Sequence, residues 1–511
     1  MVVVVVLVVV LVLSVLAGVH WYVWRRLVRD TTARGSAARR FGTAGIWILP
    51  VLSVGALVSG RAGAPFWLER TLAWPGYLWL AMLLYLVLAL VVGEAVRPLL
   101  IRVLERRAAS EAHRVAPAGV PAVGASGSPG TVLDGASAAG GAPAAGNART
   151  DAPDSAATTG VSAPRSPASG EGGRPAADAP TTVGTLTADE ASTPENVDAS
   201  QGGVPSDGGT RVPADGSAGG ALLAEPQGAA GALAASAVSR RLFVSRIVGG
   251  AAAVAAAGTV GLGTYGVLRG PRVKRVTVPL AKLPRAAHGY RIAVVSDIHL
   301  GPILGRAHTQ RIVDAINAVQ PDLVAVVGDL VDGSVEDLGP AAEPLAQLRA
   351  RHGSYFVTGN HEYFSGADAW VDHVRELGLR PLRNERVEIA GFDLAGVDDV
   401  AGEREGQGPD FARALGDRDR TRAAVLLAHQ PVVIHEAVDH GVDLQLSGHT
   451  HGGQLWPGNY LAELANPTVA GLERYGDTQL YVTRGAGAWG PPVRVGAESD
   501  ITLVQLASRQ A

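Results

Sequence analysis

The chain has 511 residues, a formal net charge of −3 and no cysteine. The length predicts several domains, and the small net charge does not point to any class of charged partner. Without cysteine, the chain has no Cys-ligated zinc site, no iron–sulfur cluster and no disulfide.

Residues 1–114 are predicted to form a membrane region with three transmembrane helices. Residues 2–24 carry no charged side chain, and about 20 apolar residues are enough to cross a bilayer. Because no basic residue precedes this run, it is interpreted as a retained helix rather than a signal peptide. Residues 43–60 and 74–92 are two further apolar spans. A buried helical core is the alternative, but the lengths and basic flanks of the spans favour membrane crossings.

Arginines set the expected orientation of this region. Six follow the first span, from Arg25 to Arg40, and five follow the third, from Arg97 to Arg114. The positive-inside rule places both segments in the cytoplasm and the amino terminus outside. Four aromatic residues cluster near the loop between the second and third spans, as at a membrane interface: Trp67, Trp74, Tyr77 and Trp79.

Residues 115–239 are rich in Ala, Gly, Pro and Ser and contain no aromatic residue, a composition that predicts a disordered linker. Residues 240–269 are expected to form either a fourth transmembrane helix or an internal twin-arginine-like signal, because Arg240 and Arg241 precede an apolar run. Both alternatives give the same topology. Four crossings predict a multi-pass protein of the cell membrane whose last domain is extracytoplasmic.

The C-terminal part contains five short apolar runs, each followed by Asp, Asn or His. They cover residues 292–295, 323–327, 355–357, 425–427 and 442–446. Such runs, bounded by turn residues, are typical of buried parallel strands. Open α/β sheets bind ligands beyond the carboxyl ends of their strands, so the polar residues are expected to meet there.

Other segments of the C-terminal part complete the expected fold. Residues 306–319 place apolar side chains on one helical face, which predicts a crossover helix between two strands. Ser365 is expected to cap a second helix that carries Trp370 and Val374 on one face. Residues 480–483 and 501–506 are expected to be late strands of a second sheet.

The polar residues at these strand ends are metal donors. Four imidazoles, two aspartates and an asparagine are costly to bury unless a metal coordinates them. Oxygen and imidazole donors without thiolates suit Mn, Fe, Zn or a mixed pair better than calcium or a structural zinc.

Five sequence blocks occur in a recognisable order. They are Asp297-Ile298-His299, Gly328-Asp329-Leu330-Val331-Asp332, Gly359-Asn360-His361-Glu362, the single His429, and Gly448-His449-Thr450-His451-Gly452-Gly453-Gln454. This order resembles the calcineurin-like metallophosphoesterases, and the Gly-Gly-Gln ending resembles their bacterial membrane-associated branch. The resemblance covers residues 276–508 and implies an α/β fold in which two mixed β-sheets form a sandwich flanked by helices.

Applied to this sequence, the resemblance implies two divalent metal ions, with Mn, Fe or Zn as candidates. It assigns Asp297, His299 and His451 to one ion, Asn360, His429 and His449 to the other, and Asp329 to both as a bridge. His361 resembles the acid or transition-state stabiliser near the leaving oxygen. In such sites the two ions clamp phosphoryl oxygens and lower the pKa of a bound water, so that the resulting hydroxide attacks phosphorus.

Several residues have interpretations other than a role in the site. Asp332 precedes a glycine and is interpreted as a turn or cap residue rather than a ligand. Glu362 either orients a neighbouring imidazole or is a surface carboxylate. Histidines outside the blocks are not expected to contact metal: His308, His352, His435 and His440. Trp489, Pro491 and Pro492 either line the pocket mouth or support the fold.

The leading functional hypothesis is a membrane-tethered, metal-dependent hydrolase of phosphomonoesters or phosphodiesters that acts outside the cytoplasmic membrane. The first alternative is a hydrolase of lipid-linked pyrophosphate or phosphodiester substrates, because the membrane segments hold the site close to the bilayer. The second is a non-catalytic membrane sensor of metal or phosphate, against which His361 argues because a binding module needs no leaving-group residue. No nucleic-acid partner is expected, since no basic stripe with interleaved aromatic residues is visible.

Overall fold

The computed structural model describes residues 2–115 and 227–510. The linker expected at residues 115–239 therefore lies almost entirely outside the described residues. The described parts on either side of it belong to one compact unit.

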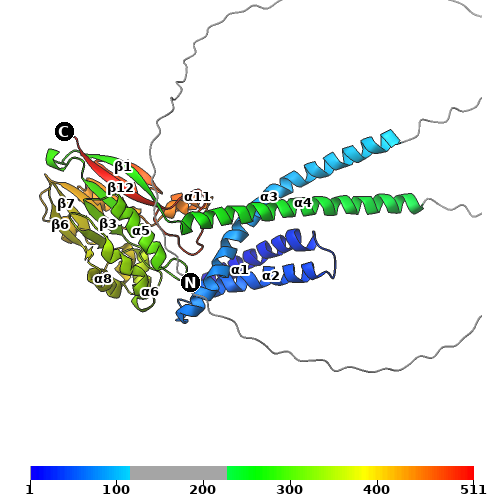
Figure 1. Cartoon of the computed structure of the whole chain (residues 1–511), viewed down its shortest axis with the longest axis horizontal. Helices are drawn as coiled ribbons and strands as arrows, with labels where there is room; N and C mark the ends of the chain where they lie inside the picture. Colours follow the sequence, from blue (N-terminus) through cyan, green and yellow to red (C-terminus); the bar gives the residue numbers. More distant parts are fainter. Residues whose placement is uncertain (1, 116–226, 511) are drawn as a thin grey trace, which may run out of the picture. The chain divides into compact units, whose positions relative to one another are not determined.

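Four long apolar helices form the membrane region (Figure 1): α1 (Val2–Trp24), α2 (Ala37–Val58), α3 (Phe66–Val115) and α4 (Gln227–Leu268). All four are long and apolar enough to cross a membrane. A short π-helical turn at Arg25–Arg29 ends α1, and the hydroxyl of Ser36 caps α2 by accepting from the backbone N–H of Arg39. Helix α3 packs along both α2 and α4, so the apolar surfaces of the spans are partly covered by one another.

The C-terminal domain contains two six-stranded mixed sheets. The first has the order β1-β12-β2-β3-β4-β5. Its strands are β1 (Arg272–Leu280), β12 (Asp500–Ser508), β2 (Arg291–Val295), β3 (Leu323–Val327), β4 (Ser354–Val357) and β5 (Arg380–Pro381). Strands β2 to β5 are parallel, and β12 pairs parallel with β1 but antiparallel with β2.

The second sheet has the order β10-β11-β9-β8-β7-β6. Its strands are β10 (Gly471–Tyr475), β11 (Thr478–Val482), β9 (Leu444–Ser447), β8 (Ala423–Leu427), β7 (Phe392–Gly396) and β6 (Glu385–Ile389). The central strands β11, β9, β8 and β7 are parallel, and an antiparallel strand closes each edge. The two sheets confirm the expected sandwich of mixed sheets.

Helices cover the outer face of each sheet. The first sheet is covered by α5 (Arg306–Ala318), α6 (Val335–Ala342) and α8 (Ala367–Glu376), and the second by α9 (Phe411–Leu415) and α10 (Ile434–Asp439). Two further short helices are α7 (Asn360–Ser365) and α11 (Gly458–Ala465). Short 3-10 turns lie at Arg285–Ala287, Glu343–Gln347, Val400–Glu405, Pro431–Val433 and His451–Gly453. Figure 1 shows α5, α6 and α8 close together beside the first sheet.

The alternation of side chains along β2 shows how these layers are held together. Ile292 and Val294 belong to the core between the two sheets, whereas Ala293 and Val295 belong to the core beneath α5, α6 and α8. Successive side chains on a strand point to opposite faces, so a strand buried on both faces has the continuous apolar run seen in the sequence.

Two expectations about this domain are wrong in detail. The segment 501–506 lies in β12, between β1 and β2 of the first sheet, and not in a second sheet with residues 480–483. Ser365 ends α7 and does not cap α8, because the N-cap position belongs to Gly366, whose φ of 94° lies in the left-handed region. A glycine adopts that conformation without the steric cost a side chain would bring.

Candidate metal centre

All the predicted donors follow the carboxyl ends of strands in the two sheets. Asp297 and His299 follow β2, Asp329 follows β3 and Asn360 follows β4. From the second sheet, His429 follows β8, and His449 and His451 follow β9. Parallel strands present their carboxyl ends at one edge, so residues up to 154 positions apart in the chain reach the same site.

The backbone at these donors is unusual. Positive φ angles occur at Asp297 (53°), His299 (49°), Asp329 (52°), His449 (71°) and His451 (53°). Aspartate and histidine tolerate the left-handed region better than most residues, but each such conformation still costs of order 1 kcal/mol or more. Backbone hydrogen bonds from neighbouring strand ends hold it in place: the N–H of Asp297 donates to Gly328 and that of His299 donates to Asp329.

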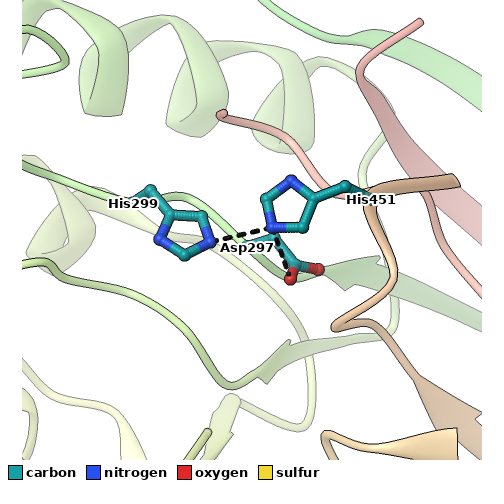
Figure 2. A group of neighbouring side chains, drawn as sticks. All are labelled: Asp297, His299 and His451. Carbon is teal, nitrogen blue, oxygen red and sulfur yellow. Dashed lines mark hydrogen bonds and ion pairs between the residues drawn. The ribbon is translucent and has the colours of Figure 1, made fainter. Parts of the chain in front are cut away.

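The first donor cluster is shown in Figure 2 and consists of Asp297, His299 and His451. The Nε2 atoms of the two histidines lie 3.0 Å apart. Nε2 of His451 also lies 3.3 Å from Oδ1 of Asp297. All three residues are buried, so the two imidazoles and the carboxylate converge on one small volume that water reaches poorly.

The second donor cluster consists of Asp329, His429 and His449. Oδ2 of Asp329 lies 3.2 Å from Nε2 of His429 and 3.7 Å from Nε2 of His299 in the first cluster. Asn360 is next to it, with Oδ1 2.9 Å from Nδ1 of His449. Asp329 therefore lies between the two clusters, in the place that the predicted bridging carboxylate requires.

These residues fit divalent metal ions. Nδ1 of His429 donates to the carbonyl of Val327 at 2.9 Å, which leaves Nε2 as its ligand atom, the arrangement usual for metal-binding histidines. That Nε2 is buried and forms no aligned hydrogen bond with any residue that the structure describes. Nε2 of His299 is left free in the same way, because its Nδ1 donates to Asp332. Nδ1 of His451 instead accepts from Nη2 of Arg494 at 3.1 Å, and its Nε2 faces that of His299.

Electrostatics couple the two clusters. Burial raises the pKa of Asp297. Burial also opposes the ionisation of Asp329, but His429 lowers its pKa well below the usual value, and Asp329 in turn raises that of His429. Burial and neighbouring positive groups lower the pKa of His451 well below its usual value and that of His449 to about 4. Imidazoles held neutral keep a lone pair for a metal.

Asp332 has a role that the sequence did not predict. Nδ1 of His299 and Nδ1 of His361 both donate to its Oδ1, at 2.8 and 2.7 Å. Asp332 therefore orients both the metal-donor residue His299 and the candidate acid His361, and it is not only a turn residue. Burial opposes the ionisation of Asp332, but His299 and His361 lower its pKa to about 2. Burial disfavours a charge on His361, yet Asp332 raises its pKa to about 9.

Glu362 is buried and is not a surface carboxylate. Its Oε2 accepts from the backbone N–H groups of Asp329 and Gly359, at 3.0 and 2.6 Å, and its Oε1 accepts from that of Leu330 at 2.7 Å. It orients the backbone that carries Asp329, rather than an imidazole as the sequence allowed. Burial, followed by the charge of Asp329, raises its pKa to about 7.

Two glycines of the sequence blocks allow the strand ends to approach closely. A Cβ at Gly448 would overlap Oγ of Ser296 and Oδ2 of Asp297. A Cβ at Gly359 would overlap Oδ1 of Asp329. Glycine at these positions therefore lets the carboxylates of both clusters reach the centre.

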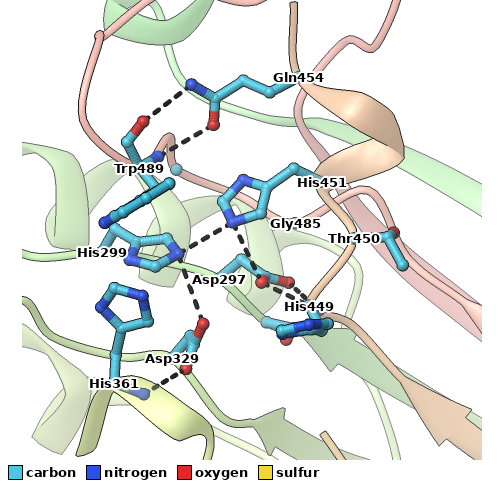
Figure 3. Close-up of polar contacts among 12 residues, drawn as sticks. Asp297, His299, Asp329, His361, His449, Thr450, His451, Gln454, Gly485 and Trp489 are labelled. Carbon is cyan, nitrogen blue, oxygen red and sulfur yellow. Dashed lines mark hydrogen bonds and ion pairs between the residues drawn. The ribbon is translucent and has the colours of Figure 1, made fainter. Parts of the chain in front are cut away.

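Two further residues support the site. Figure 3 shows Gln454 bound to the backbone of Trp489: its Nε2 donates to the Trp489 carbonyl at 2.9 Å, and its Oε1 accepts from the Trp489 N–H at 3.0 Å. Buried Arg494 donates to the carbonyl of His451 at 3.0 Å. Arg494 lies outside every motif block, so only its tertiary position reveals its contact with a donor segment.

Some of the remaining aromatic, proline and histidine residues line the cavity beside the site, and the others lie away from it. Trp489 and Pro492 line a cavity that His299 and His361 also line, and the Trp489 ring meets that of His361 edge to face, with centroids 5.8 Å apart. Pro491 does not line it. Among the described residues, the donor groups around the centre include none of the histidines outside the motif blocks: His308, His352, His435 and His440.

Comparison with known proteins agrees with this geometry. Residues 290–453 match the family model of the calcineurin-like phosphoesterases. The chain is 35% identical over 243 residues to a metallophosphoesterase of Aquifex aeolicus, which covers 47% of this chain and 92% of that protein.

Two other relatives are longer than the matched region. A zebrafish (Danio rerio) transmembrane protein with metallophosphoesterase domain is 40% identical over 265 residues, 48% of this chain and 61% of that protein. A metallophosphoesterase of Helicobacter pylori is 38% identical over 247 residues, 48% of this chain and 66% of that protein. The chain thus spans about three fifths of the zebrafish relative. The extensive match to the Aquifex protein, together with the family model, shows that this chain belongs to the calcineurin-like phosphoesterase family.

Proposed function

We propose that this protein is a membrane-tethered phosphohydrolase that uses two divalent metal ions to hydrolyse phosphomonoesters or phosphodiesters. The observation that carries the proposal is the position of Asp329, which is grouped with His299 on one side and with His429 and His449 on the other. Divalent ions held there would neutralise phosphoryl oxygens and supply a nucleophile near neutral pH.

Residues beside the metal donors are placed to protonate the leaving group. His361 lies at the edge of the centre, its ring 4.7 Å from that of His299, and lines the cavity. Asp332 accepts from Nδ1 of His361, which fixes the ring so that Nε2 is the atom that gives a proton to the leaving oxygen. Proton donation of this kind contributes ~10²–10⁴-fold to a rate. A binding-only sensor would not need this pair.

The test is the full-length protein with Asp329→Asn. We expect the wild-type protein to bind two equivalents of Mn²⁺ and to hydrolyse p-nitrophenyl phosphate or bis(p-nitrophenyl) phosphate. Asp329→Asn should hydrolyse neither ester and should lose most of its bound metal, because the carboxylate shared by the two clusters is removed. Asp314→Asn, an exposed residue on α5 that contacts Gln310, is the matched control. Wild-type protein that binds metal tightly but hydrolyses neither ester would support the sensor instead.

We also propose that the catalytic domain lies outside the cytoplasm. Basic residues from three helices meet at one end of the membrane region: Arg26 pairs with Glu94 at 2.7 Å, Arg97 donates to Ser245 at 3.0 Å, and Arg246 donates to the carbonyl of Thr31 at 3.0 Å. The positive-inside rule assigns this end to the cytoplasm. The loop between α2 and α3 is at the other end of its helices and shares a cavity with the domain.

Because the chain has no cysteine, single cysteines report this topology without interference. On intact cells, a membrane-impermeant maleimide should label Ala62→Cys in the α2–α3 loop and Asp477→Cys in the domain, but not Ala33→Cys in the α1–α2 loop. All three should be labelled after the cells are lysed. If only Ala33→Cys were labelled on intact cells, the protein would have the opposite orientation, with the catalytic domain in the cytoplasm.

A further inference from the structure

The metal centre opens into a cavity whose opposite wall comes from the membrane region. The cavity measures about 440 Å³, within the ~300–1,000 Å³ of small-molecule sites. The domain contributes His299, His361 and Trp489, and the ends of α2 and α3 with their connecting loop contribute Leu57, Arg61 and Phe66. A substrate at the metal centre therefore also meets residues of the membrane helices.

This wall combines a cation, Arg61, and a carboxylate, Glu69, with apolar surface. Arg61 is exposed, and its Nη1 donates to the carbonyl of Leu57 at 3.2 Å, which leaves most of its five N–H donors for a ligand. Large apolar side chains around the cavity are also exposed: Phe364 by 66%, Trp489 by 50% and Leu57 by 39%. Exposed apolar groups gathered beside a polar site are typical of surfaces that bind apolar ligands or membranes.

The segment that follows the last donors is anchored on the membrane helices. The hydroxyl of Tyr85 in α3 donates to the carbonyl of Trp456 at 3.0 Å, and Val493 is buried in the core of the helical bundle. From Tyr85 to Arg97 is twelve residues of α3, or ~18 Å at 1.5 Å per residue. The hydrocarbon core of a bilayer is ~30 Å thick. With Arg97 at the cytoplasmic edge of this core, the carbonyl of Trp456 lies just beyond the bilayer midplane, in the outer half of the hydrocarbon core.

Helix α11 begins directly after this anchor and exposes apolar side chains. Leu461 is 71% exposed, Leu464 84% and Tyr460 58%, and none of the residues in α11 is buried. Through its link to Trp456, this apolar face lies in the outer leaflet, where it contacts lipid beside the cavity.

We propose that the α2–α3 loop is part of the substrate site, and that the substrate is a phosphate ester of a membrane lipid whose headgroup is bound by Arg61. The proposal rests on the proposed function, because the metal centre supplies the chemistry. The phosphate reaches the donor clusters through the cavity, while the acyl or isoprenoid chains stay along Leu57 and Phe66 in the outer leaflet. A substrate that never leaves the bilayer explains why a hydrolase domain shares its cavity with membrane helices.

Hydrolysis of matched esters by the full-length protein in lipid nanodiscs with Mn²⁺ tests this. Phosphatidic acid is compared with glycerol 3-phosphate, and phosphatidylglycerol with glycerophosphoglycerol. We expect the lipid of at least one pair to have a kcat/KM about tenfold or more above that of its soluble counterpart, since apolar contacts discriminate by this order. Arg61→Gln should lower the lipid's kcat/KM about tenfold, whereas Arg70→Gln, an exposed arginine of α3 outside the cavity, should not.

A second readout does not depend on turnover. Phosphatidic acid with a photoactivatable diazirine near the headgroup is irradiated with the protein in nanodiscs containing a chelator, and adducts are located by mass spectrometry. We expect adducts at residues 57–66 and 488–492, reduced in Arg61→Gln. Hydrolysis of soluble esters without a preference for lipid and without these adducts overturns this inference but leaves the proposed function intact. Adducts without hydrolysis of any ester overturn the proposed function while supporting the lipid site.

Discussion

Nε2 of His299 and Nε2 of His451 face each other at 3.0 Å, although 152 positions separate them in the chain. Asp332 accepts a hydrogen bond from Nδ1 of His299 and so fixes its ring. Arg494 donates to the backbone carbonyl of His451. Together with Asp297, these two imidazoles form the first donor cluster. In the proposed two-metal site, this contact is where the first ion would bind.

His451→Ala is expected to bind one equivalent of Mn²⁺ where the wild-type protein binds two. The reason is that His451 belongs to the first donor cluster only, so Asp329, His429 and His449 remain in place for the second ion. Atomic emission on the purified protein after dialysis measures this. Retention of two equivalents would show that His451 is not a ligand, and loss of both would show that the two clusters do not bind independently.

His361→Asn is expected to lower kcat by ~10²–10⁴-fold without changing the metal content. The loss should be larger for an alkyl phosphate than for p-nitrophenyl phosphate, because a poor leaving group depends more on protonation. Rates for both esters and the bound metal are measured on the same preparation. The exposed His435 of α10 gives the control His435→Asn. Equal losses for the two esters would contradict a proton-donating role.

Asp332→Asn is expected to weaken metal binding by ~10–100-fold, the usual effect of removing an acceptor behind a ligating histidine. Its Oδ1 accepts from both His299 and His361, so the change frees one ligand ring and the candidate acid together. Competition with a fluorescent chelator measures the affinity, and Asp314→Asn on α5 is the matched control. If the affinity for metal were unchanged, Asp332 would have only the turn role that its sequence predicts.

His308→Leu is expected to make the protein less sensitive to acid. His308 is buried on α5, and neither ring nitrogen has a hydrogen-bond partner in the described part of the chain. Burial, with smaller effects from Arg311 and Arg494, lowers its pKa from 6.5 to about 3. Between these values the unfolded chain binds a proton that the folded protein does not. The stabilising contribution is therefore complete above pH 6.5 and decreases as the pH falls towards 3.

At pH 5 this protonation difference lowers the free energy of unfolding by ~2 kcal/mol, at 1.36 kcal/mol per pKa unit. The thermal midpoint of the detergent-solubilised full chain is measured at about pH 7 and about pH 5, with a chelator present so that metal loss does not contribute. His308→Leu should show a smaller drop than the wild-type protein, and the exposed His435→Leu should show the same drop as wild type. An unchanged drop in His308→Leu would contradict the prediction.

The elements whose pattern is local were predictable from the sequence. The strands that carry the donors were predictable because each is a short, largely apolar run followed by a polar residue, as β3 at Leu323–Val327 illustrates. The spans were predictable because the length of an apolar run is set by bilayer thickness. The crossover helix α5 was found from its amphipathic period. In each case the physical determinant lies within one stretch of about 5 to 25 residues.

Placement between distant segments was not predictable. The strand at residues 501–506 shows the same apolar pattern for either sheet, and only pairing with β1 and β2 decided its place. The sequence predicts a turn role for Asp332, and for Glu362 either an acceptor for an imidazole or a surface carboxylate. Only the fold brings His361 to Asp332 and the backbone of Asp329 to Glu362.

The sequence by itself determined which side chains this protein has available for a metal centre and which helices are long and apolar enough to cross a membrane, because residue identity and local periodicity are sufficient for both. Only the tertiary structure decided that the donors converge around Asp329 and that Arg61 of a membrane loop lines the same cavity as His361. These relationships depend on strand order and on the packing of helices against the domain, and such long-range contacts leave no periodic signal in either partner.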